Sequence, residues 1–477
     1  MRKGYPLQIG GGETESGNWL PVTNPYDGAL LTEVALAGPA EIDRAVAAAE
    51  EAFPGWRDSG NYRRVEVLER MVAGLRRRRE EMAATIVAEA GKPLTLARIE
   101  VDRAANTFTL AAEEAKRIGG EVIPLDLQPD SEGRLGLTSR FPLGVIAAIT
   151  PFNFPLNLVA HKVAPALAGG NAVILKPSSQ APVSALMLGE IAGEAGLPPG
   201  VMNVVPAKSR VASSLVPDPR IRMVTFTGSP DVGWALRAQA GKKKVLLELG
   251  GNASAVVEAD ADLDFAARRI ALGGFAYAGQ ICISVQHVLV HRDVFGDFRD
   301  LFLRAVADLA VGDPADPSTM VGPMIDREAA DRVMAWIGEA REAGAELLCG
   351  GRQRGTLVDP TVLEGTGPAM KVGCREVFGP VTTLDSYDDF SEALERVNAT
   401  VYGLQAGVFT ANLNRAFEAY RRIDAGGVII NDFPTFRVDH MPYGGVKESG
   451  LGREGVRYAV EEMTELRLLV LNLSSPT

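Results

Sequence analysis

The segment Val145-Ile146-Ala147-Ala148-Ile149 is an uninterrupted apolar run, the composition of a strand buried on both faces of a parallel sheet. A helical pattern follows it, then a second apolar run, and strand and helix continue to alternate up to residue 226. This alternation predicts a doubly wound α/β sheet, in which helices connect neighbouring parallel strands. The expected helices cover 156–167 and 182–195, and the further strands cover 172–175, 201–205 and 223–226.

The region before this sheet is predicted to be mainly helical. Residues 40–53, 63–90 and 94–118 place apolar residues at helical spacing with charged residues between them. Residues 121–140 alternate loosely and contain turn-forming residues, which indicates an extended, hairpin-like excursion.

A second α/β series begins near Ala253, with strands expected at 285–290 and 427–431. The chain then reaches a strongly apolar run at 466–471, close to its end. A terminal strand of this kind is an exposed edge unless another subunit covers it. The sequence therefore predicts two α/β units and an edge that favours association.

Bulk composition narrows the class of protein. The 477 residues favour two or three domains, and the net charge of −11 argues against nucleic acid as a partner. No apolar run reaches the ~20 residues that span a bilayer, and the N-terminus lacks the apolar core of a signal peptide. Three cysteines and four scattered histidines indicate neither a disulfide framework nor a metal site. A cytoplasmic protein is expected.

Two glycine-rich stretches carry the chemistry. Cys282 lies in Gly279-Gln280-Ile281-Cys282-Ile283-Ser284, and Glu248 lies upstream in Leu247-Glu248-Leu249-Gly250-Gly251-Asn252. A thiol nucleophile and a carboxylate base are the two groups needed to oxidise an aldehyde through a covalent thioester. On its own the pair is weak evidence, because most unpaired cysteines are inert core residues.

Four landmarks accompany the cysteine and the glutamate. With them, the chain resembles the NAD(P)-dependent aldehyde dehydrogenase family from about Asn24 to Gly455. The landmarks are Thr150-Pro151-Phe152-Asn153-Phe154-Pro155, Leu175-Lys176-Pro177-Ser178, Phe226-Thr227-Gly228-Ser229 and Glu376-Val377-Phe378-Gly379-Pro380.

The resemblance implies an α/β fold with three parts. These are a Rossmann-type cofactor domain, an α/β catalytic domain and a small β oligomerisation element, assembled as a homodimer or homotetramer. The expected boundaries are 1–119 and 143–249 for the cofactor domain, 250–455 for the catalytic domain, and 120–142 and 456–477 for the oligomerisation element.

The resemblance also implies roles for individual residues. The Asn153 amide and the Cys282 backbone N–H would stabilise the oxyanion, Glu248 would activate water, and Glu454 would help relay protons. Gly228 and Ser229 stand at a strand-to-helix junction, where the helix N-terminus favours a phosphate. The other expected cofactor residues are Lys176 at the adenosine ribose, Glu376 and Phe378 near the nicotinamide ribose, and Thr150 and Phe152 in the same landmark as Asn153.

The sequence favours NADP over NAD as the cofactor. Relatives that prefer NAD commonly carry a glutamate three residues after the lysine, and this chain has Ser179 there. A carboxylate would repel a 2′-phosphate, whereas a serine would not. Lys208 and Arg210 follow the next strand and offer two cations to the phosphate. The alternative is that they are solvated surface charges, which is the more common state of cations on a loop.

The substrate is less well defined by the sequence. Parts of the chain resemble the branch that holds lactaldehyde, phosphonoacetaldehyde, succinate-semialdehyde and non-phosphorylating glyceraldehyde-3-phosphate dehydrogenases. Many of those substrates carry an anion, which an arginine would hold bidentately. Arg103, Arg437 and His161 are the candidates, and each has an alternative interpretation as a structural residue. Two alternatives to the function itself are a CoA-acylating enzyme and a non-catalytic member of the fold.

Overall fold

The computed structural model describes residues 1–473. The apolar run that begins at residue 145 is a central strand of an eight-stranded sheet, the first sheet below. This run is β8 (Val145–Ile149), whose five residues are all buried between two parallel neighbours, β9 (Ala172–Lys176) and β11 (Ile221–Thr227). The sheet has eight strands in the order β22-β12-β11-β8-β9-β10-β2-β3. Its other strands are β2 (Leu7–Ile9), β3 (Gly12–Thr14), β10 (Met202–Val204), β12 (Lys244–Glu248) and β22 (Gly450–Leu451).

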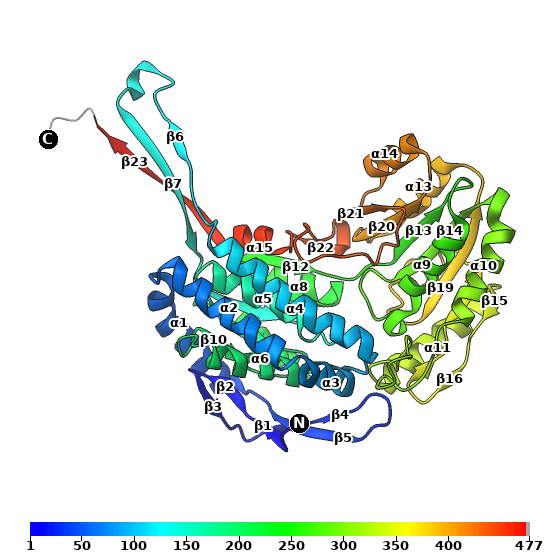
Figure 1. Cartoon of the computed structure of the whole chain (residues 1–477), viewed down its shortest axis with the longest axis horizontal. Helices are drawn as coiled ribbons and strands as arrows, with labels where there is room; N and C mark the ends of the chain where they lie inside the picture. Colours follow the sequence, from blue (N-terminus) through cyan, green and yellow to red (C-terminus); the bar gives the residue numbers. More distant parts are fainter. Residues whose placement is uncertain (474–477) are drawn as a thin grey trace.

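Helices cover both faces of this sheet, as the predicted doubly wound fold requires (Figure 1). Ile146 and Ala148 of β8 pack in one core, and Val145 and Ala147 pack in another, because successive side chains of a strand point to opposite faces. The first core holds α2 (Asn61–Arg77), α3 (Arg79–Ala90), α4 (Leu94–Ala115), α5 (Asn157–Ala168), α6 (Val183–Glu194) and α15 (Val456–Glu462); the second holds α1 (Pro39–Arg57), α7 (Ser209–Ala212) and α8 (Pro230–Gln239).

The helical spacing over 63–90 belongs to two helices, α2 and α3. The break falls at Arg78, whose φ of −97° and ψ of 18° are not helical. The Arg78 guanidinium pairs with Glu190 of α6 at 2.9 Å and with Glu81 at 2.8 Å. The helical spacing of apolar residues continues through the break because both helices bury apolar side chains in the same core.

The second α/β series forms a seven-stranded sheet in the order β15-β18-β19-β14-β13-β20-β21. The strands expected at 285–290 and 427–431 are β14 (Val285–His291) and β21 (Gly427–Ile430). The other strands are β13 (Ala253–Val257), β15 (Glu346–Cys349), β18 (Thr361–Glu364), β19 (Val381–Tyr387) and β20 (Gln405–Phe409). The helices around it are α9 (Leu263–Phe275), α10 (Phe295–Ala307), α11 (Arg327–Glu342), α12 (Lys371–Cys374), α13 (Phe390–Asn398) and α14 (Leu413–Arg422).

The predicted excursion and the terminal strand form one sheet that projects from the body (Figure 1). β23 (Thr464–Asn472) pairs along its whole length with β7 (Arg134–Pro142), which also pairs with β6 (Val122–Pro124). The terminal strand is therefore paired on one edge only. Its apolar side chains between Leu466 and Leu471 remain largely exposed.

The remaining elements are short. Among residues 1–473, no helix is long and apolar enough to cross a membrane. The strand β22 lies beyond residue 250 in the sequence and pairs with β12 at the edge of the first sheet. The short elements are β1 (Gly4–Tyr5), β4 (Trp19–Thr23), β5 (Leu30–Ala35), β16 (Gln353–Arg354), β17 (Leu357–Val358), η1 (Pro129–Ser131), η2 (Ser213–Leu215), η3 (Ala276–Gly279), η4 (Arg292–Val294) and η5 (Lys447–Ser449).

Candidate active site

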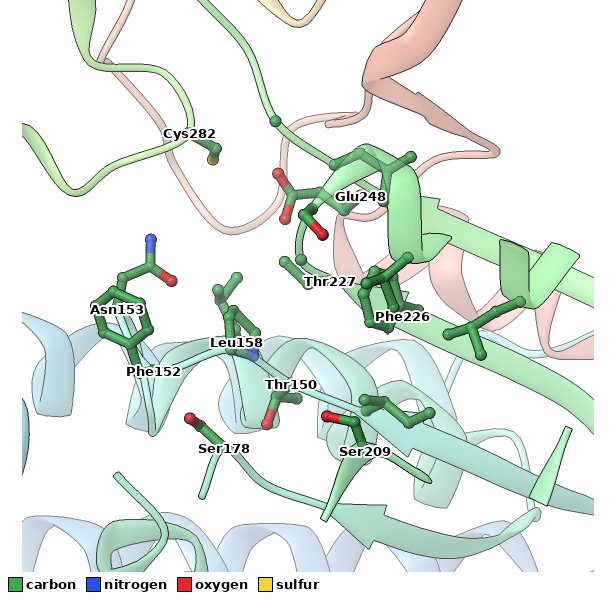
Figure 2. Close-up of a pocket in the computed structure, with 18 of the residues that line it drawn as sticks. Thr150, Phe152, Asn153, Leu158, Ser178, Ser209, Phe226, Thr227, Glu248 and Cys282 are labelled. Atoms are coloured by element: carbon green, nitrogen blue, oxygen red, sulfur yellow. The ribbon is translucent and has the colours of Figure 1, made fainter. Parts of the chain in front are cut away.

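A cleft of about 500 Å³ opens at the carboxyl edge of the first sheet. Parallel strands β8, β9, β11 and β12 all end there, so the residues that follow them come together. Figure 2 shows Thr150, Asn153, Thr227 and Glu248 around this space. Three of the four landmarks and Glu248 therefore converge because each follows a strand of the same sheet. Glu376 and Phe378 reach the cleft from the segment between α12 and β19.

A second cavity, of about 290 Å³, meets the cleft at Cys282. Cys282 lies between η3 and β14, at the side of the cleft opposite the first sheet. Cys282 and Leu158 line both cavities. We call this second cavity the tunnel. A small molecule in the tunnel would reach the thiol from one side, and a molecule in the cleft would reach it from the other.

The Glu248 carboxylate is buried close to the thiol. Glu248 is 1% exposed, and neither of its carboxylate oxygens has a hydrogen-bond partner within the described residues. Burial, followed by the negative charge of Glu454, raises the pKa of Glu248 to about 7. A carboxylate poised near neutral pH and free of partners has the properties of a general base.

Asn153 points its amide towards the same space (Figure 2). Its Nδ2 donates a hydrogen bond of 3.0 Å to the Gln280 carbonyl, and its buried Oδ1 has no partner in the described part of the chain. The amide is therefore tied to the loop that carries Cys282, two residues before the thiol. Its expected role at the oxyanion stays a prediction.

Glu454 lies behind Glu248 in a buried network of charges. Its carboxylate accepts from Lys162 at 2.9 Å and from Arg437 at 3.1 Å. Although burial opposes ionisation, the two cations lower the pKa of Glu454 to about 2. The network also includes Thr225, to which Lys162 donates at 3.1 Å. Lys162 had no signal in the sequence, because a lysine inside an apolar helix is visible only when its partners are known.

Most of the expected cofactor residues line the cleft. Lys176 has no carboxylate partner within residues 1–473, and burial lowers the pKa of its ammonium to about 8. Burial also raises the pKa of Glu376 to about 8, and this carboxylate accepts from the Gly251 N–H at 3.0 Å. The other expected residues that line the cleft are Thr150, Phe152, Gly228, Ser229 and Phe378.

These residues fit a dinucleotide. The hydroxyls of Thr150 and Thr227 are buried at the cleft wall and have no hydrogen-bond partner among residues 1–473, so the cleft offers polar groups to a ligand. Ser229 is the N-cap of α8, which directs free backbone N–H groups towards the cleft. A Cβ on Gly250 would lie 2.2 Å from Glu376, so a side chain there would displace this carboxylate.

Three residues expected to select the cofactor lie outside this lining. The Ser179 hydroxyl donates to the Ala207 carbonyl at 3.3 Å, and Lys208 and Arg210 are exposed. Their neighbours line the cleft instead, because successive residues of an extended or turning segment point in different directions. Polar lining residues to which the sequence analysis gave no role include Ser178, Gln180, Ser209, Ser213 and Arg332.

The tunnel contains two of the three expected substrate residues. Arg103 and Arg437 lie on its wall with Lys92, whereas His161 does not. His161 is 1% exposed and contacts Asp439 at 3.0 Å, and burial followed by Arg437 lowers its pKa. His161 is therefore a core histidine. The apolar part of the wall includes Phe154, Leu158, Ile281, Phe433 and Phe436.

The two arginines are held differently. Arg103 donates to Asp439 at 2.8 Å through Nη2, and Asp439 also accepts from Asn157 at 3.2 Å. The Arg437 guanidinium stacks 3.6 Å above the Tyr443 ring while it pairs with Glu454. Both cations are thus oriented by neighbours before any substrate enters.

Comparison with known proteins agrees with this site. The sequence profile described as the aldehyde dehydrogenase family matches residues 13–469, and the chain belongs to that family. The chain is thus an NAD(P)-dependent aldehyde dehydrogenase, which confirms the resemblance seen in the sequence. It is 45% identical to a 3-sulfolactaldehyde dehydrogenase of Priestia megaterium, over 99% of this chain and 98% of that protein.

Solved structures give the same result. The aldehyde dehydrogenase ALDH21 of Physcomitrella patens, in complex with the reaction product succinate, superposes with a TM-score of 0.97 at 44% identity over the whole of both chains. A glyceraldehyde-3-phosphate dehydrogenase of Methanocaldococcus jannaschii complexed with NADP has a TM-score of 0.92 at 38% identity, over 95% of this chain and 99% of that one. The predicted α/β fold is confirmed.

Proposed function

We propose that this aldehyde dehydrogenase oxidises a small aldehyde that carries an anionic group. The observation behind this proposal is the pair of arginines on the tunnel wall, Arg103 and Arg437. A guanidinium can bind a carboxylate or sulfonate bidentately, through two parallel N–H···O hydrogen bonds to two of its oxygens. The tunnel volume of about 290 Å³ lies at the lower end of the range for ligand sites, which favours a short molecule.

The relatives support the same class of substrate. One is a 3-sulfolactaldehyde dehydrogenase, another is a sulfoacetaldehyde dehydrogenase of Neptuniibacter caesariensis at 38% identity, and the ALDH21 structure holds succinate. These compounds share a short chain with a sulfonate or a carboxylate. A lactaldehyde dehydrogenase of Methanocaldococcus jannaschii at 38% identity makes an uncharged hydroxyaldehyde the second candidate.

The proposed chemistry uses Cys282, Asn153 and Glu248. The Cys282 thiolate attacks the aldehyde carbon, and the Asn153 amide with the Cys282 backbone N–H stabilises the resulting oxyanion. Bound in the cleft, NAD(P)⁺ would supply the hydride acceptor. Loss of the hydride from the former aldehyde carbon would leave a thioester on the Cys282 sulfur. Glu248 then removes a proton from water, whose oxygen attacks the thioester carbon and releases the acid with the thiolate restored.

NADP is proposed to be used at least as well as NAD. Ser179 presents no negative charge to a 2′-phosphate, and the exposed cations Lys208 and Arg210 lie on the loop tied to Ser179 through Ala207. Related structures include an enzyme complexed with NADP and one described as NAD-dependent, from Sinorhizobium meliloti, so the family accommodates both.

Assembly as a dimer or tetramer is proposed through the projecting sheet. The exposed apolar side chains of β23 and its free edge would be covered by a second copy of the chain. In this proposal residues 120–142 and 456–477 form the oligomerisation element, of which 474–477 lie outside the described residues. Residues 1–119 and 143–249 form the cofactor domain, and 250–455 the catalytic domain. Three cysteines without a disulfide among the described residues fit a cytoplasmic location.

A spectrophotometric panel tests the substrate proposal. We expect NAD(P)H formation at 340 nm with succinate semialdehyde and sulfolactaldehyde to exceed that with lactaldehyde at least tenfold in kcat/KM. An Arg103→Met variant should lose about 10–100-fold with the anionic aldehydes, since a hydrogen bond to a charged group contributes roughly 1.5–3 kcal/mol. Lactaldehyde serves as the internal control, and equal losses with all three substrates would refute the anion-binding role. Addition of CoA should yield free acid rather than acyl-CoA.

A further inference from the structure

The Tyr443 hydroxyl lies 3.1 Å from the Cys282 sulfur, a contact that the proposed reaction does not use. Tyr443 belongs to the loop that precedes β22 and is 2% exposed. Its ring lines the tunnel beside the thiol. A phenol at this distance from a nucleophilic sulfur is within hydrogen-bonding range, so the contact can alter the state of the thiol.

Tyr443 is fixed from two directions. Its backbone forms an antiparallel bridge with Glu454, through the Tyr443 N–H to the Glu454 carbonyl at 3.0 Å and the Glu454 N–H to the Tyr443 carbonyl at 2.6 Å. Its ring is covered by the Arg437 guanidinium at 3.6 Å, and Arg437 in turn pairs with the Glu454 carboxylate. Tyr443, Arg437 and Glu454 therefore contact one another in turn, and these contacts hold the Tyr443 hydroxyl at the sulfur.

The other groups around the thiol have other partners or roles. Glu248 is a carboxylate, which in its ionised form can only accept hydrogen bonds. The Asn153 Nδ2 donates one N–H to the Gln280 carbonyl, and its second N–H is the donor proposed for the oxyanion. The positive charge of Arg437 lowers the pKa of the thiol, but its guanidinium stacks on the Tyr443 ring and donates to the Glu454 carboxylate. Among these neighbours Tyr443 is the neutral donor that reaches the sulfur.

Electrostatics around the sulfur favour a donor at this position. Burial, followed by the negative charge of Glu248, raises the pKa of the Cys282 thiol, whereas the Tyr443 hydroxyl and Arg437 act in the opposite direction. Burial also raises the pKa of Tyr443, and a phenol is ordinarily a weaker acid than a thiol, so the phenol is the proton donor of the pair. Since a thiolate can only accept, the hydrogen bond then runs from the phenol to the sulfur.

We propose that Tyr443 is a positioning residue that donates a hydrogen bond to the Cys282 thiolate and holds the sulfur where the cleft and the tunnel meet. This inference rests on the proposed role of Cys282 as the nucleophile. The hydrogen bond increases the fraction of thiolate without adding charge to the tunnel. Once the sulfur carries the substrate carbon it is neutral and a weak acceptor, so the hydrogen bond weakens.

The hydrogen bond has two opposing effects on the reactivity of Cys282: it increases the fraction of thiolate, and it lowers the intrinsic nucleophilicity of that thiolate. A hydrogen bond to a charged group contributes enough to shift a thiol pKa by roughly one to two pH units. Each such unit increases the thiolate fraction about tenfold but lowers its intrinsic nucleophilicity about threefold, because the Brønsted coefficient is about 0.4–0.5. Below the pKa the gain in thiolate dominates, by about threefold for each unit.

The test is the pH dependence of Cys282 alkylation in Tyr443→Phe, which keeps the ring beneath Arg437. Iodoacetamide is added to the full-length protein without substrate between pH 6 and pH 10.5, and modification of the Cys282 peptide is followed by mass spectrometry. We expect the rate at pH 7.5 to fall about 3–10-fold and the profile to move upwards by about one to two pH units. The thermal midpoint and the affinity for NADP should stay unchanged.

Tyr277→Phe is the matched control. Tyr277 is another buried tyrosine of the tunnel wall, but its hydroxyl donates to the Ala90 carbonyl at 2.9 Å, so its loss should leave the alkylation profile as in the wild type. Equal alkylation rates of Tyr443→Phe and wild type at pH 7.5, or the same change in both variants, would overturn the proposal. Alkylation requires no substrate, so this result is independent of whether Cys282→Ala abolishes oxidation.

Discussion

Replacement of Glu248 by glutamine removes the base while keeping the size of the side chain. Within the described residues neither oxygen of this carboxylate has a hydrogen-bond partner, so the substitution breaks no internal bond. The next nearest acid in the network, Glu454, is held by Lys162 and Arg437 with a pKa near 2, and so is a poor proton acceptor at neutral pH. We expect steady-state kcat to fall about 10²–10⁴-fold, the usual effect of losing a general base.

The pH profile of the wild-type enzyme tests the size of the pKa shift of Glu248. The difference between the usual value of 4.5 and a pKa of about 7 means that burial and Glu454 disfavour the charged form of Glu248 by about 3 kcal/mol. A base works only when deprotonated, so thioester hydrolysis should decline as pH falls through about 7. About a tenth of that activity should remain one pH unit lower. The acid limb should disappear in Glu248→Gln.

Stopped-flow absorbance at 340 nm separates the two half-reactions. Glu248→Gln should release up to one NAD(P)H per active site in a burst and then turn over slowly, with the acyl group detectable on the Cys282 peptide by mass spectrometry. Glu258→Gln is the control, because Glu258 is also buried but contacts Tyr387 and Arg415 away from the cleft. Unchanged steady-state turnover in Glu248→Gln would refute the assignment and make Glu454 the next residue to test.

Three further predictions follow from the same structure. Cys282→Ala should abolish NAD(P)-dependent oxidation while the protein stays folded and binds cofactor by fluorescence titration; retained activity would contradict the mechanism. Ser179→Glu should shift the ratio of kcat/KM towards NAD by about 1–4 kcal/mol, because a carboxylate repels the 2′-phosphate and accepts from a 2′-hydroxyl. Strict NAD dependence of the wild type would show that this reasoning is wrong. Leu468→Arg, on the exposed β23, should turn a dimer or tetramer into a monomer by light scattering at micromolar concentration, and a monomeric wild type would disprove the predicted interface.

The order of strands and the main site residues were accessible from the sequence because both depend on local signals. An apolar run such as 145–149 predicts a buried strand wherever it stands. Asn153 and Glu248 could then be placed at one edge of the sheet, because parallel strands bring their carboxyl ends together. The break at Arg78 had no such signal: the apolar spacing runs through it, and its ion pair with Glu190 of another helix is visible only in the folded chain.

Tertiary structure alone decided which side chains face one another. Cys282 and Tyr443 are 161 positions apart, and Lys162 and Glu454 are 292 apart, so no local pattern predicts that they touch. His161 illustrates the same limit, since its place in a candidate motif did not reveal that it points into the core. The sequence by itself determined which chemical groups lie at the ends of which strands. Packing of the second sheet and the returning C-terminal segment against the first determined their partners and charges, because those depend on burial and on contacts between distant parts of the chain.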